Sequence, residues 1–342
     1  TVAGCPMRNE IQSRVTTALQ PLVGDAPVSL NFGVMNDEQR AKVRTMLNGN
    51  PSATAGSQQA HGHAEGRSVP FAAKDSKTRV LLISSGKGGV GKSSVTTNLA
   101  VALAARGHSV GIVDADIYGY SIPRMLGADR EPVVIDNMLL PPEAWGVRCI
   151  SIGYFVPEGQ AVVWRGPMLH RAIEQFLCDV FWGDLDFLLV DLPPGTGDVA
   201  ISLGQLLPTA QTIVVTTPQV AAAEVAERSG SVGLQTGQSV FGVIENMAWL
   251  VQPDGSKFEL FGNGGGLAVA ERLTKISGTQ VDLLGQIPIS IALREGSDAG
   301  APVSLTSKQD PAAEVIIAIA KKIAATKLGL AGRRLGISPV NG

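Results

Sequence analysis

The sequence predicts an α/β fold in which a mostly parallel β-sheet is covered by helices on both faces. The first observation is the alternation, from Arg79 onward, of short apolar runs with stretches of helical periodicity. The second is a glycine-rich loop, GKGGVGKS, between the first apolar run and the helix that follows it. Parallel strands bury both faces and end at a common edge of the sheet, so we expect the functional residues at that edge.

Each predicted strand is a short apolar run that ends near a turn-forming or acidic residue. The runs are RVLLIS, SVGIVD, VRCISI, DFLLVDL, TIVVTTP and VFGVIEN. Helical stretches separate several of them, including MLHRAIEQFLCDVF, VAISLGQLL and AAAEVAERSGSVGLQ. This alternation is typical of a doubly covered parallel sheet.

The rest of the chain predicts four parts. Residues 1–48 carry a helical pattern, a strand-like run and a second helical pattern, which indicate a small partial α+β domain. Residues 49–78 lack periodicity and are rich in Ser, Ala, Gly and Gln, as flexible linkers are. Residues 79–330 form the main domain and 331–342 a tail. Because the chain starts at Thr1 in the middle of a pattern, we expect a piece to precede it.

Composition excludes several classes of function. The chain has 342 residues, of which 44% are hydrophobic and 17% charged, as in soluble globular proteins. The net charge of −2 argues against nucleic acid as a partner bound by a broad basic face. No apolar run approaches the ~20 residues of a membrane span, so no membrane partner is expected. The cysteines Cys5, Cys149 and Cys178 are odd in number and widely spaced, which favours a reducing, cytoplasmic setting.

The glycine-rich loop predicts a phosphate-binding site. It matches G-x-x-x-x-G-K-[ST] and lies between a strand and a helix, the context in which this pattern binds nucleotides. Its backbone N–H groups and the helix N-terminus favour phosphate. Lys92 would contact the terminal phosphates and Ser93 would bind Mg²⁺. The expected nucleotide contacts are Gly86, Lys87, Gly88, Gly89, Val90, Gly91, Lys92, Ser93 and Ser94.

Carboxylates follow two of the other predicted strands. Asp114 and Asp116 stand at i and i+2, so they point to the same side of the strand end. We assign Asp116 to orienting the attacking water and Asp114 to the metal shell, although the reverse assignment is open. Asp191 ends an apolar strand, as the carboxylate near Mg²⁺ does in P-loop NTPases. Ser93, Asp114 and Asp191 are the predicted magnesium ligands.

Loops at other strand ends complete the predicted site. The segment PPGTGD could sense the γ-phosphate, with Gly195 and Gly197 as hinges. Asp198 at its end is expected to cap the next helix. Asn246 in IENM is expected to hydrogen-bond an adenine edge, and Pro288 in GQIP to pack nearby.

Together these motifs resemble the Mrp-type iron–sulfur carrier ATPases. The segments that carry the resemblance are GKGGVGKS, DADIYGYSIPRMLG, WRGPMLHRAIEQFL, DLPPGTGDVAISL, TTPQ and IENM, within about residues 79–300. This family belongs to the deviant-Walker-A P-loop NTPases, a group that includes MinD, ParA and the nitrogenase iron protein. AGCPMRNEIQ and VMNDEQR, near the start of the chain, resemble the end of the small iron–sulfur assembly domain often fused ahead of the ATPase.

The resemblance implies a homodimer with ATP held between its two copies. In this group the extra lysine of the loop, here Lys87, reaches the phosphates bound by the other subunit. The implied activity is slow, Mg²⁺-dependent ATP hydrolysis that assists transfer of iron–sulfur clusters to apoproteins or assembly factors. The predicted catalytic residues are Lys87, Lys92 and Asp116. Lys87 is an added cation that stabilises charge on the transferring phosphoryl group.

One part of the family pattern is absent. Many Mrp-type proteins carry a CxxC motif after ENM, and two such pairs at a dimer interface can hold a [4Fe–4S] cluster. Gln252 and Gly255 occupy those positions here, and QPDG predicts a turn that leads into a hairpin arm. Cys149 and Cys178 are expected in the core. Cys5, in a Cys-Pro pair that matches the assembly domain, is the remaining candidate ligand for iron–sulfur or sulfur.

Two other functions fit parts of the sequence. A MinD- or ParA-like positioning switch would bind membrane or DNA, and the C-terminal helix has the apolar residues and basic end that a membrane-targeting helix needs. Its apolar positions Val315, Ile316, Ile319 and Ile323 also suit packing on the sheet, which we favour. A small-molecule kinase would need an acceptor site, and the sequence contains no distinct acceptor-binding motif.

Overall fold

A computed structural model describes residues 69–73, 76–117, 119–135, 138–156 and 166–326, together with Thr16 and Leu30. The chain divides into two compact units, Thr1–His63 and Ala64–Gly342, and the following description concerns the second. Cys5 and the tail predicted at 331–342 lie outside the described residues, as do nearly all of the partial domain and most of the linker. The bounds of the four predicted parts therefore stay predictions.

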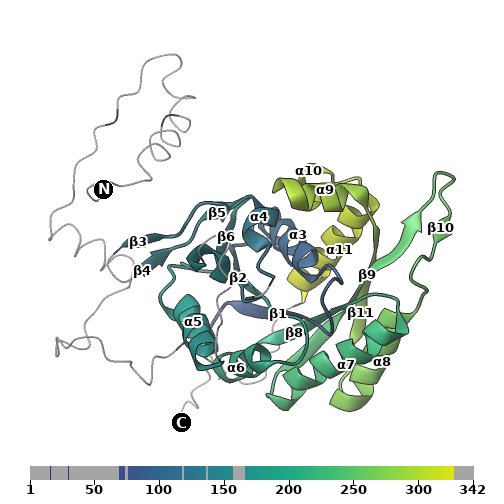
Figure 1. Cartoon of the computed structure of the whole chain (residues 1–342), viewed down its shortest axis with the longest axis horizontal. Coiled ribbons are helices and arrows are strands. Elements are labelled where there is room, and N and C mark those ends of the chain that lie inside the picture. Colours follow the sequence, from purple (N-terminus) through teal and green to yellow (C-terminus); the bar gives the residue numbers. More distant parts are fainter. Residues whose placement is uncertain are drawn as a thin grey trace, which may run out of the picture. The chain divides into compact units, whose positions relative to one another are not determined.

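A nine-stranded sheet forms the centre of the second unit (Figure 1). Its order is β10-β9-β8-β1-β7-β2-β6-β5, and β11 pairs with β9 outside this path. The strands of the sheet are β1 (Arg79–Ser85), β2 (Val110–Asp114), β5 (Glu143–Ala144), β6 (Val147–Ser151), β7 (Phe187–Asp191), β8 (Gln211–Thr216), β9 (Ser239–Val251), β10 (Lys257–Phe258) and β11 (Asp282–Ile289). Strands β3 (Val133–Ile135) and β4 (Met138–Leu140) form a separate antiparallel pair.

The predicted parallel sheet is confirmed. All pairings from β9 through β8, β1, β7 and β2 to β6 are parallel, whereas β10 and β5 add short antiparallel strands at the ends. Every residue of β1, β2 and β7 is buried, because helices cover both faces of these central strands. This burial explains why their sequences are continuous apolar runs with no polar alternation.

Helices cover the two faces as separate layers (Figure 1). One layer contains α3 (Lys92–Ala104), α4 (Ile122–Leu126), α9 (Ile291–Ala299), α10 (Val303–Thr306) and α11 (Pro311–Ala325). The other contains α5 (Gly166–Cys178), α6 (Asp198–Leu206), α7 (Val220–Gln235) and α8 (Gly265–Ser277). Short 3₁₀ turns, η1 (Pro70–Ala72) and η2 (Ile152–Phe155), flank the main elements. The predicted α/β layering is therefore confirmed.

The C-terminal helix α11 belongs to the core. Ile316, Ile319 and Ile323 are at most 1% exposed, and the helix packs against α3 and β11. Asp310 caps it, since its carboxylate accepts hydrogen bonds from the N–H groups of Ala312 and Ala313. The apolar face is thus used in folding, as the sequence favoured. Within the part of the chain that the structure describes, no helix combines the length and hydropathy needed to cross a membrane.

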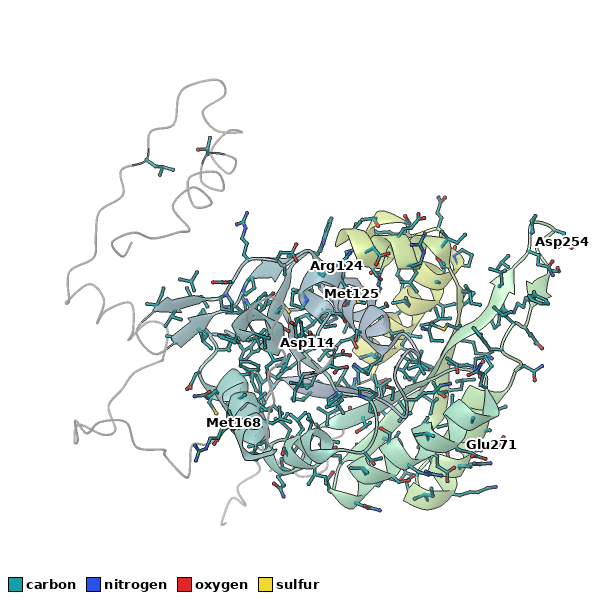
Figure 2. All side chains as sticks on the ribbon, in the orientation of Figure 1. Asp114, Arg124, Met125, Met168, Asp254 and Glu271 are labelled. Atoms are coloured by element: carbon teal, nitrogen blue, oxygen red, sulfur yellow. The ribbon has the colours of Figure 1, made fainter. Side chains whose placement is uncertain are left out.

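Strand β9 continues beyond its predicted end and forms an extended hairpin with β10. The turn QPDG closes it, with a hydrogen bond from Gly255 N to Gln252 O of 2.9 Å and with φ of +82° at Gly255. Figure 2 labels Asp254 at the tip, where its carboxylate accepts hydrogen bonds from the N–H and hydroxyl of Ser256. The predicted turn and hairpin arm are confirmed. The hairpin exposes the apolar side chains Leu250, Val251, Phe258 and Leu260.

Candidate nucleotide-binding site

The phosphate loop has the backbone conformation that its glycines predict. Gly89 and Gly91 both have φ of +78°, a left-handed conformation that side chains disfavour. Gly91 is the N-cap of α3, which begins at Lys92, so the first N–H groups of this helix lie directly under the loop. At Gly86 a Cβ atom would fall 2.3 Å from the backbone of α7 at Val225 and Ala226. Only glycine allows this close approach.

Asp191 accepts hydrogen bonds from one ammonium group and two hydroxyl groups at the start of α3. It ends β7, and its carboxylate accepts a hydrogen bond from Lys92 Nζ at 2.5 Å and one from Ser93 Oγ at 2.6 Å. The hydroxyl of Thr96, one helical turn after Lys92, donates to the other carboxylate oxygen at 2.6 Å. Asp191 is fully buried. The strand register causes this convergence, because Asp191 stands opposite Ile83 in β1, directly before the loop.

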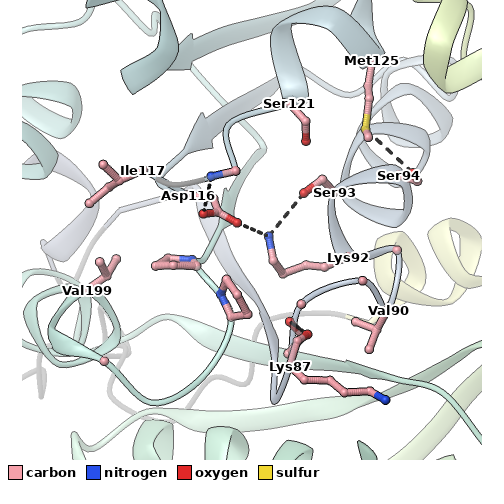
Figure 3. Close-up of a pocket in the computed structure, with 18 of the residues that line it drawn as sticks. Lys87, Val90, Lys92, Ser93, Ser94, Asp116, Ile117, Ser121, Met125 and Val199 are labelled. Atoms are coloured by element: carbon pink, nitrogen blue, oxygen red, sulfur yellow. Dashed lines mark hydrogen bonds and ion pairs between the residues drawn. The ribbon is translucent and has the colours of Figure 1, made fainter. Parts of the chain in front are cut away.

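A cavity of about 600 Å³ opens above the loop (Figure 3). Asp116 lines it, and Asp116 Oδ2 lies 3.9 Å from Lys92 Nζ. The N–H of Gly119 donates to the other oxygen of Asp116, which holds this carboxylate at the cavity wall. Every predicted nucleotide contact from Lys87 to Ser94 lines the cavity. Its other walls carry Ile117, Met125, Leu169, Pro193, Pro194 and Val199.

Asp114 faces a different environment from Asp116. It is fully buried, and its carboxylate accepts hydrogen bonds from the N–H groups of Ser121 and Ile122 and from the hydroxyl of Ser151. Burial, followed by the charge of Asp191, raises the pKa of Asp114 to about 7, against the opposing effect of Ser151. Asp114 does not line the cavity. These hydrogen bonds, together with one from the N–H of Asp116, hold the loop that carries Asp116, and the metal role of Asp114 stays a prediction.

Asn246 contacts the phosphate loop from outside the cavity, and Pro288 does not line the cavity either. Asn246 Nδ2 donates a 2.9 Å hydrogen bond to the carbonyl of Val90, and both Asn246 and Pro288 are buried outside the cavity lining. Asn246 therefore supports the backbone of the phosphate loop. Its contact with an adenine edge, and the packing of Pro288 beside the base, stay predictions.

The segment PPGTGD contributes Pro193, Pro194 and Gly197 to the cavity wall. Gly195 has φ of +95°, and its N–H donates to the carbonyl of Ser85 at 2.8 Å, so this loop is tied to the end of β1. Gly197 lines the cavity and is the N-cap of α6, which begins at Asp198. The expectation that Asp198 is the cap was therefore wrong by one position, since Asp198 is the first helical residue. The hinge roles of Gly195 and Gly197 stay predictions.

Lys87, the extra lysine, does not point toward Asp116. Its ammonium donates a 2.8 Å hydrogen bond to the side-chain oxygen of Gln219, the residue before α7. Figure 3 shows Lys87 extending away from Lys92 along the rim of the cavity. Lys87 thus lines the cavity, but its ammonium is held by Gln219 and not by the carboxylates near Lys92.

The cysteines of the described region are structural. Cys149 is fully buried in the core, and Cys178 is half-buried against the second core cluster, as predicted. Burial raises the pKa of the Cys149 thiol far above its usual range, so this sulfur does not ionise at neutral pH. Among the described residues no group of three or more His, Cys, Asp and Glu side chains could hold a metal ion. Gln252 and Gly255 lie in the exposed hairpin turn and supply no thiolate.

Sequence reasoning missed two residues of the site. Thr96 stands four residues after Lys92 on one helix, and this spacing could have revealed it because such residues share a face. Gln219 could not be found in this way. It contacts Lys87 across 132 positions of sequence, and no local pattern encodes that pairing.

Comparison with known proteins identifies the family. The family model described as ParA, NUBPL iron-transfer P-loop NTPase, matches residues 76–324. The chain belongs to this family. A curated relative from Mycobacterium leprae (strain TN), an iron-sulfur cluster carrier protein, is 51% identical over 339 residues, which cover 99% of this chain and 85% of the relative. The predicted resemblance to iron–sulfur carrier ATPases is therefore confirmed at the level of the family.

Solved structures of similar proteins confirm the fold. A nucleotide-binding protein from Archaeoglobus fulgidus, in complex with ADP, has a TM-score of 0.56 and 35% identity, covering 68% of this chain and 92% of that one. The septum site-determining protein MinD from Pyrococcus horikoshii OT3, complexed with Mg-ADP, has a TM-score of 0.55 and 25% identity, covering 76% of this chain and 100% of that one. The family and its fold thus agree with the site geometry in indicating a nucleotide-binding P-loop NTPase.

Proposed function

We propose that this protein is a dimeric, Mg²⁺-dependent ATPase that carries iron–sulfur clusters to apoproteins. The observation that supports the nucleotide chemistry best is the convergence of Lys92 and Ser93 on Asp191 at the N-terminus of α3. The cargo is proposed from the 51% identical relative that bears the name of carrier. The cytoplasmic setting inferred from the cysteines is part of the same proposal.

The side chains at the loop fit a magnesium–phosphate group. Ser93 Oγ and the Asp191 carboxylate are hard oxygen donors that share a hydrogen bond of 2.6 Å, and Mg²⁺ prefers such donors together with substrate phosphates. When bound there, Mg²⁺ would neutralise charge on the β- and γ-phosphates. The Lys92 ammonium is close enough to reach the same phosphates from its place beside Asp191.

Hydrolysis would be carried by groups on the cavity wall. Asp116 holds the attacking water, whose oxygen forms a bond to the γ-phosphorus while the bond to the bridging oxygen breaks and ADP leaves. Asp116 accepts the proton of that water, or a hydrogen bond from it, as the attack proceeds. Asp114 shapes the loop that presents Asp116, through the hydrogen bonds it accepts from Ser121, Ile122 and Ser151. Lys92 stabilises the charge on the transferred group.

The second copy of the chain completes the site in this proposal. The ammonium of Lys87 is held by Gln219 and extends away from Lys92, so in this proposal it approaches phosphates bound by a facing copy. Lys87→Ala should therefore lower ATP turnover by at least tenfold, as the loss of one stabilising cation does. ATP affinity, measured by equilibrium binding of a fluorescent ATP analogue, should change less than threefold. The matched variant Lys321→Ala, at an exposed position of α11, should leave both quantities unchanged.

Normal turnover by Lys87→Ala would overturn the cross-subunit role. Loss of nucleotide affinity in step with turnover would assign Lys87 to its own phosphate site instead. Absence of any Mg²⁺-dependent ATP hydrolysis by the unaltered protein would remove the ATPase itself from the proposal.

A further inference from the structure

Lys87 is bound at its tip by a residue from another part of the chain. Both partners are half-buried, and the 2.8 Å distance from Lys87 Nζ to Gln219 Oε1 is that of a well-formed hydrogen bond. Gln219 ends the segment TTPQ at the end of β8 and is the N-cap residue of α7. Its side chain makes no capping hydrogen bond, so its oxygen is available to the lysine.

Helix α7 is held in place against the phosphate loop. Gly86, next to Lys87, approaches the α7 backbone so closely that a single added carbon would lie 2.3 Å from it. On the same helix, Ser229 Oγ donates a 3.4 Å hydrogen bond to the carbonyl of Gly195 in the PPGTGD loop. Because these contacts fix α7 at Val225, Ala226 and Ser229, they also fix where Gln219 can present its oxygen. The lysine contact is therefore built into the packing of the loop.

The chemistry of the contact makes it reversible. An amide oxygen accepts a hydrogen bond from an ammonium but carries no charge, so Lys87 keeps its full positive charge while bound. Phosphate oxygens are charged acceptors and form the stronger bond with an ammonium. A carboxylate in place of the amide would form an ion pair and compete with phosphate directly.

We propose that Gln219 is a positioning residue: its hydrogen bond holds Lys87 in a resting position at the rim of the cavity until a second copy of the chain binds. Lys87 leaves Gln219 when it engages phosphates bound by a second copy of the chain, so this hydrogen bond is broken as the dimer closes. The inference rests on the proposed function, because it assumes that Lys87 acts across the dimer. It goes further in naming the residue that sets how readily the lysine is released.

Two substitutions of opposite chemistry test whether the hydrogen bond from Lys87 to Gln219 opposes dimerisation. Gln219→Leu keeps a similar side-chain volume without the acceptor, and Gln219→Glu keeps the acceptor and adds a charge. The measurements are kcat and KM for ATP, and the dimer fraction by analytical ultracentrifugation with a non-hydrolysable ATP analogue. We expect dimerisation to be favoured about two- to fivefold in Gln219→Leu and disfavoured by a similar factor in Gln219→Glu, the range of partly exposed contacts. The kcat at full dimerisation should change less than twofold.

Control variants separate the lysine contact from effects on α7. Gln235 is exposed at the far end of the same helix, so Gln235→Leu and Gln235→Glu introduce the same changes away from Lys87. Neither should shift the dimer fraction. In a Lys87→Ala background, Gln219→Leu and Gln219→Glu should give equal dimer fractions, because the group through which they act is gone.

The outcomes distinguish this inference from the function on which it rests. The inference is supported if the dimer fraction is highest in Gln219→Leu, intermediate in the unaltered protein and lowest in Gln219→Glu. A fall in both variants means that Gln219 is needed in the closed dimer, and no change in either means that the contact is without consequence; each result overturns the inference. An unaltered chain that stays monomeric with the analogue overturns the dimer proposal itself.

Discussion

At the scale of single residues, Asp191 decides how the phosphate loop is arranged. A buried carboxylate is stable only when paired and hydrogen-bonded, and Asp191 obtains these partners from Lys92, Ser93 and Thr96. The same pairing brings together the groups that a nucleotide and its metal require. Stability and the proposed nucleotide chemistry would therefore depend on the same few hydrogen bonds.

Adjacent threonines of α3 allow this dependence to be tested. Thr96 and Thr97 are both buried, but only Thr96 donates to Asp191, whereas Thr97 Oγ1 has no hydrogen-bond partner among the described residues. Thr96→Val should lower the free energy of unfolding by about 1–3 kcal/mol, because it removes a hydrogen bond to a charged group. Thr97→Val should change it by less than about 0.5 kcal/mol or raise it. Urea denaturation measures both, and equal losses in the two variants would contradict the assignment.

Local patterns predicted part of this arrangement. Lys92 and Ser93 follow from the loop motif, and Asp191 from an apolar strand that ends in a carboxylate. Asp114 shows where such reasoning ends. Its spacing from Asp116 places both at one strand end, but the backbone N–H groups of Ser121 and Ile122 bind Asp114 inside the fold while Asp116 lines the cavity. Which of two carboxylates faces a ligand depends on how the following loop packs.

At the scale of elements, the contact between α7 and the phosphate loop is a tight requirement of the site. A Cβ at Gly86 would lie 2.3 Å from α7 backbone atoms, whereas a Cβ at Gly88 would have Pro194 as its nearest neighbour at 3.9 Å. Gly86→Ala should therefore lower the free energy of unfolding by about 1–3 kcal/mol, as overpacking does. Gly88→Ala should lower it by less than about 1 kcal/mol. Thermal denaturation of both variants distinguishes a packed glycine from a flexible one.

If Gly86→Ala were as stable as Gly88→Ala, α7 would be free to move away from the loop. Gln219 would then have no fixed position from which to hold Lys87. The stability of these two variants therefore also tests whether α7 fixes Gln219 beside Lys87. This test is independent of any measurement of ATP turnover.

Helix α11 has a consequence for the membrane alternative. Its apolar residues Ile316, Ile319 and Ile323 are buried against α3 and β11, so a vesicle could bind them only if the core opened. We expect no ATP-dependent pelleting of the protein with vesicles rich in anionic lipid. Pelleting that requires ATP would favour a positioning switch over a carrier. The matched measurement without nucleotide controls for adsorption.

At the scale of the whole molecule, the candidate residues for ATP chemistry and for cluster binding belong to different regions. The nucleotide site lies within the described α/β unit, whereas Cys5, the candidate ligand for iron–sulfur or sulfur, lies outside the described residues. Anaerobic reconstitution with iron and sulfide, followed by iron and sulfide analysis per dimer, should give about four of each if the dimer holds one [4Fe–4S] cluster. Cys5→Ser should abolish this binding. Retention of iron in Cys5→Ser would assign the cluster to other ligands.

The hairpin of β9 and β10 provides a second test of the dimer. Gln252→Cys with Gly255→Cys would restore a CxxC pair in an exposed turn, at the cost of about 1–2 kcal/mol for a side chain at the left-handed position. If the two hairpins meet in the dimer, this double variant should bind iron even in a Cys5→Ser background. Gln252→Ser with Gly255→Ser carries the same strain without thiols and should bind none. If the cysteine variant binds no iron, we would conclude that the two hairpins do not meet in the dimer.

The sequence by itself determined the fold class and the nucleotide-binding loop of this protein. Both depend on local signals, because burial makes a strand apolar and a phosphate loop needs glycine at defined positions. The tertiary structure decided the contacts between distant segments. It buried the apolar face of α11 in the core, directed Asp116 rather than Asp114 into the cavity, and bound Lys87 to Gln219. These pairings join residues far apart in sequence, and only the packing of helices on the sheet brings them within hydrogen-bonding distance.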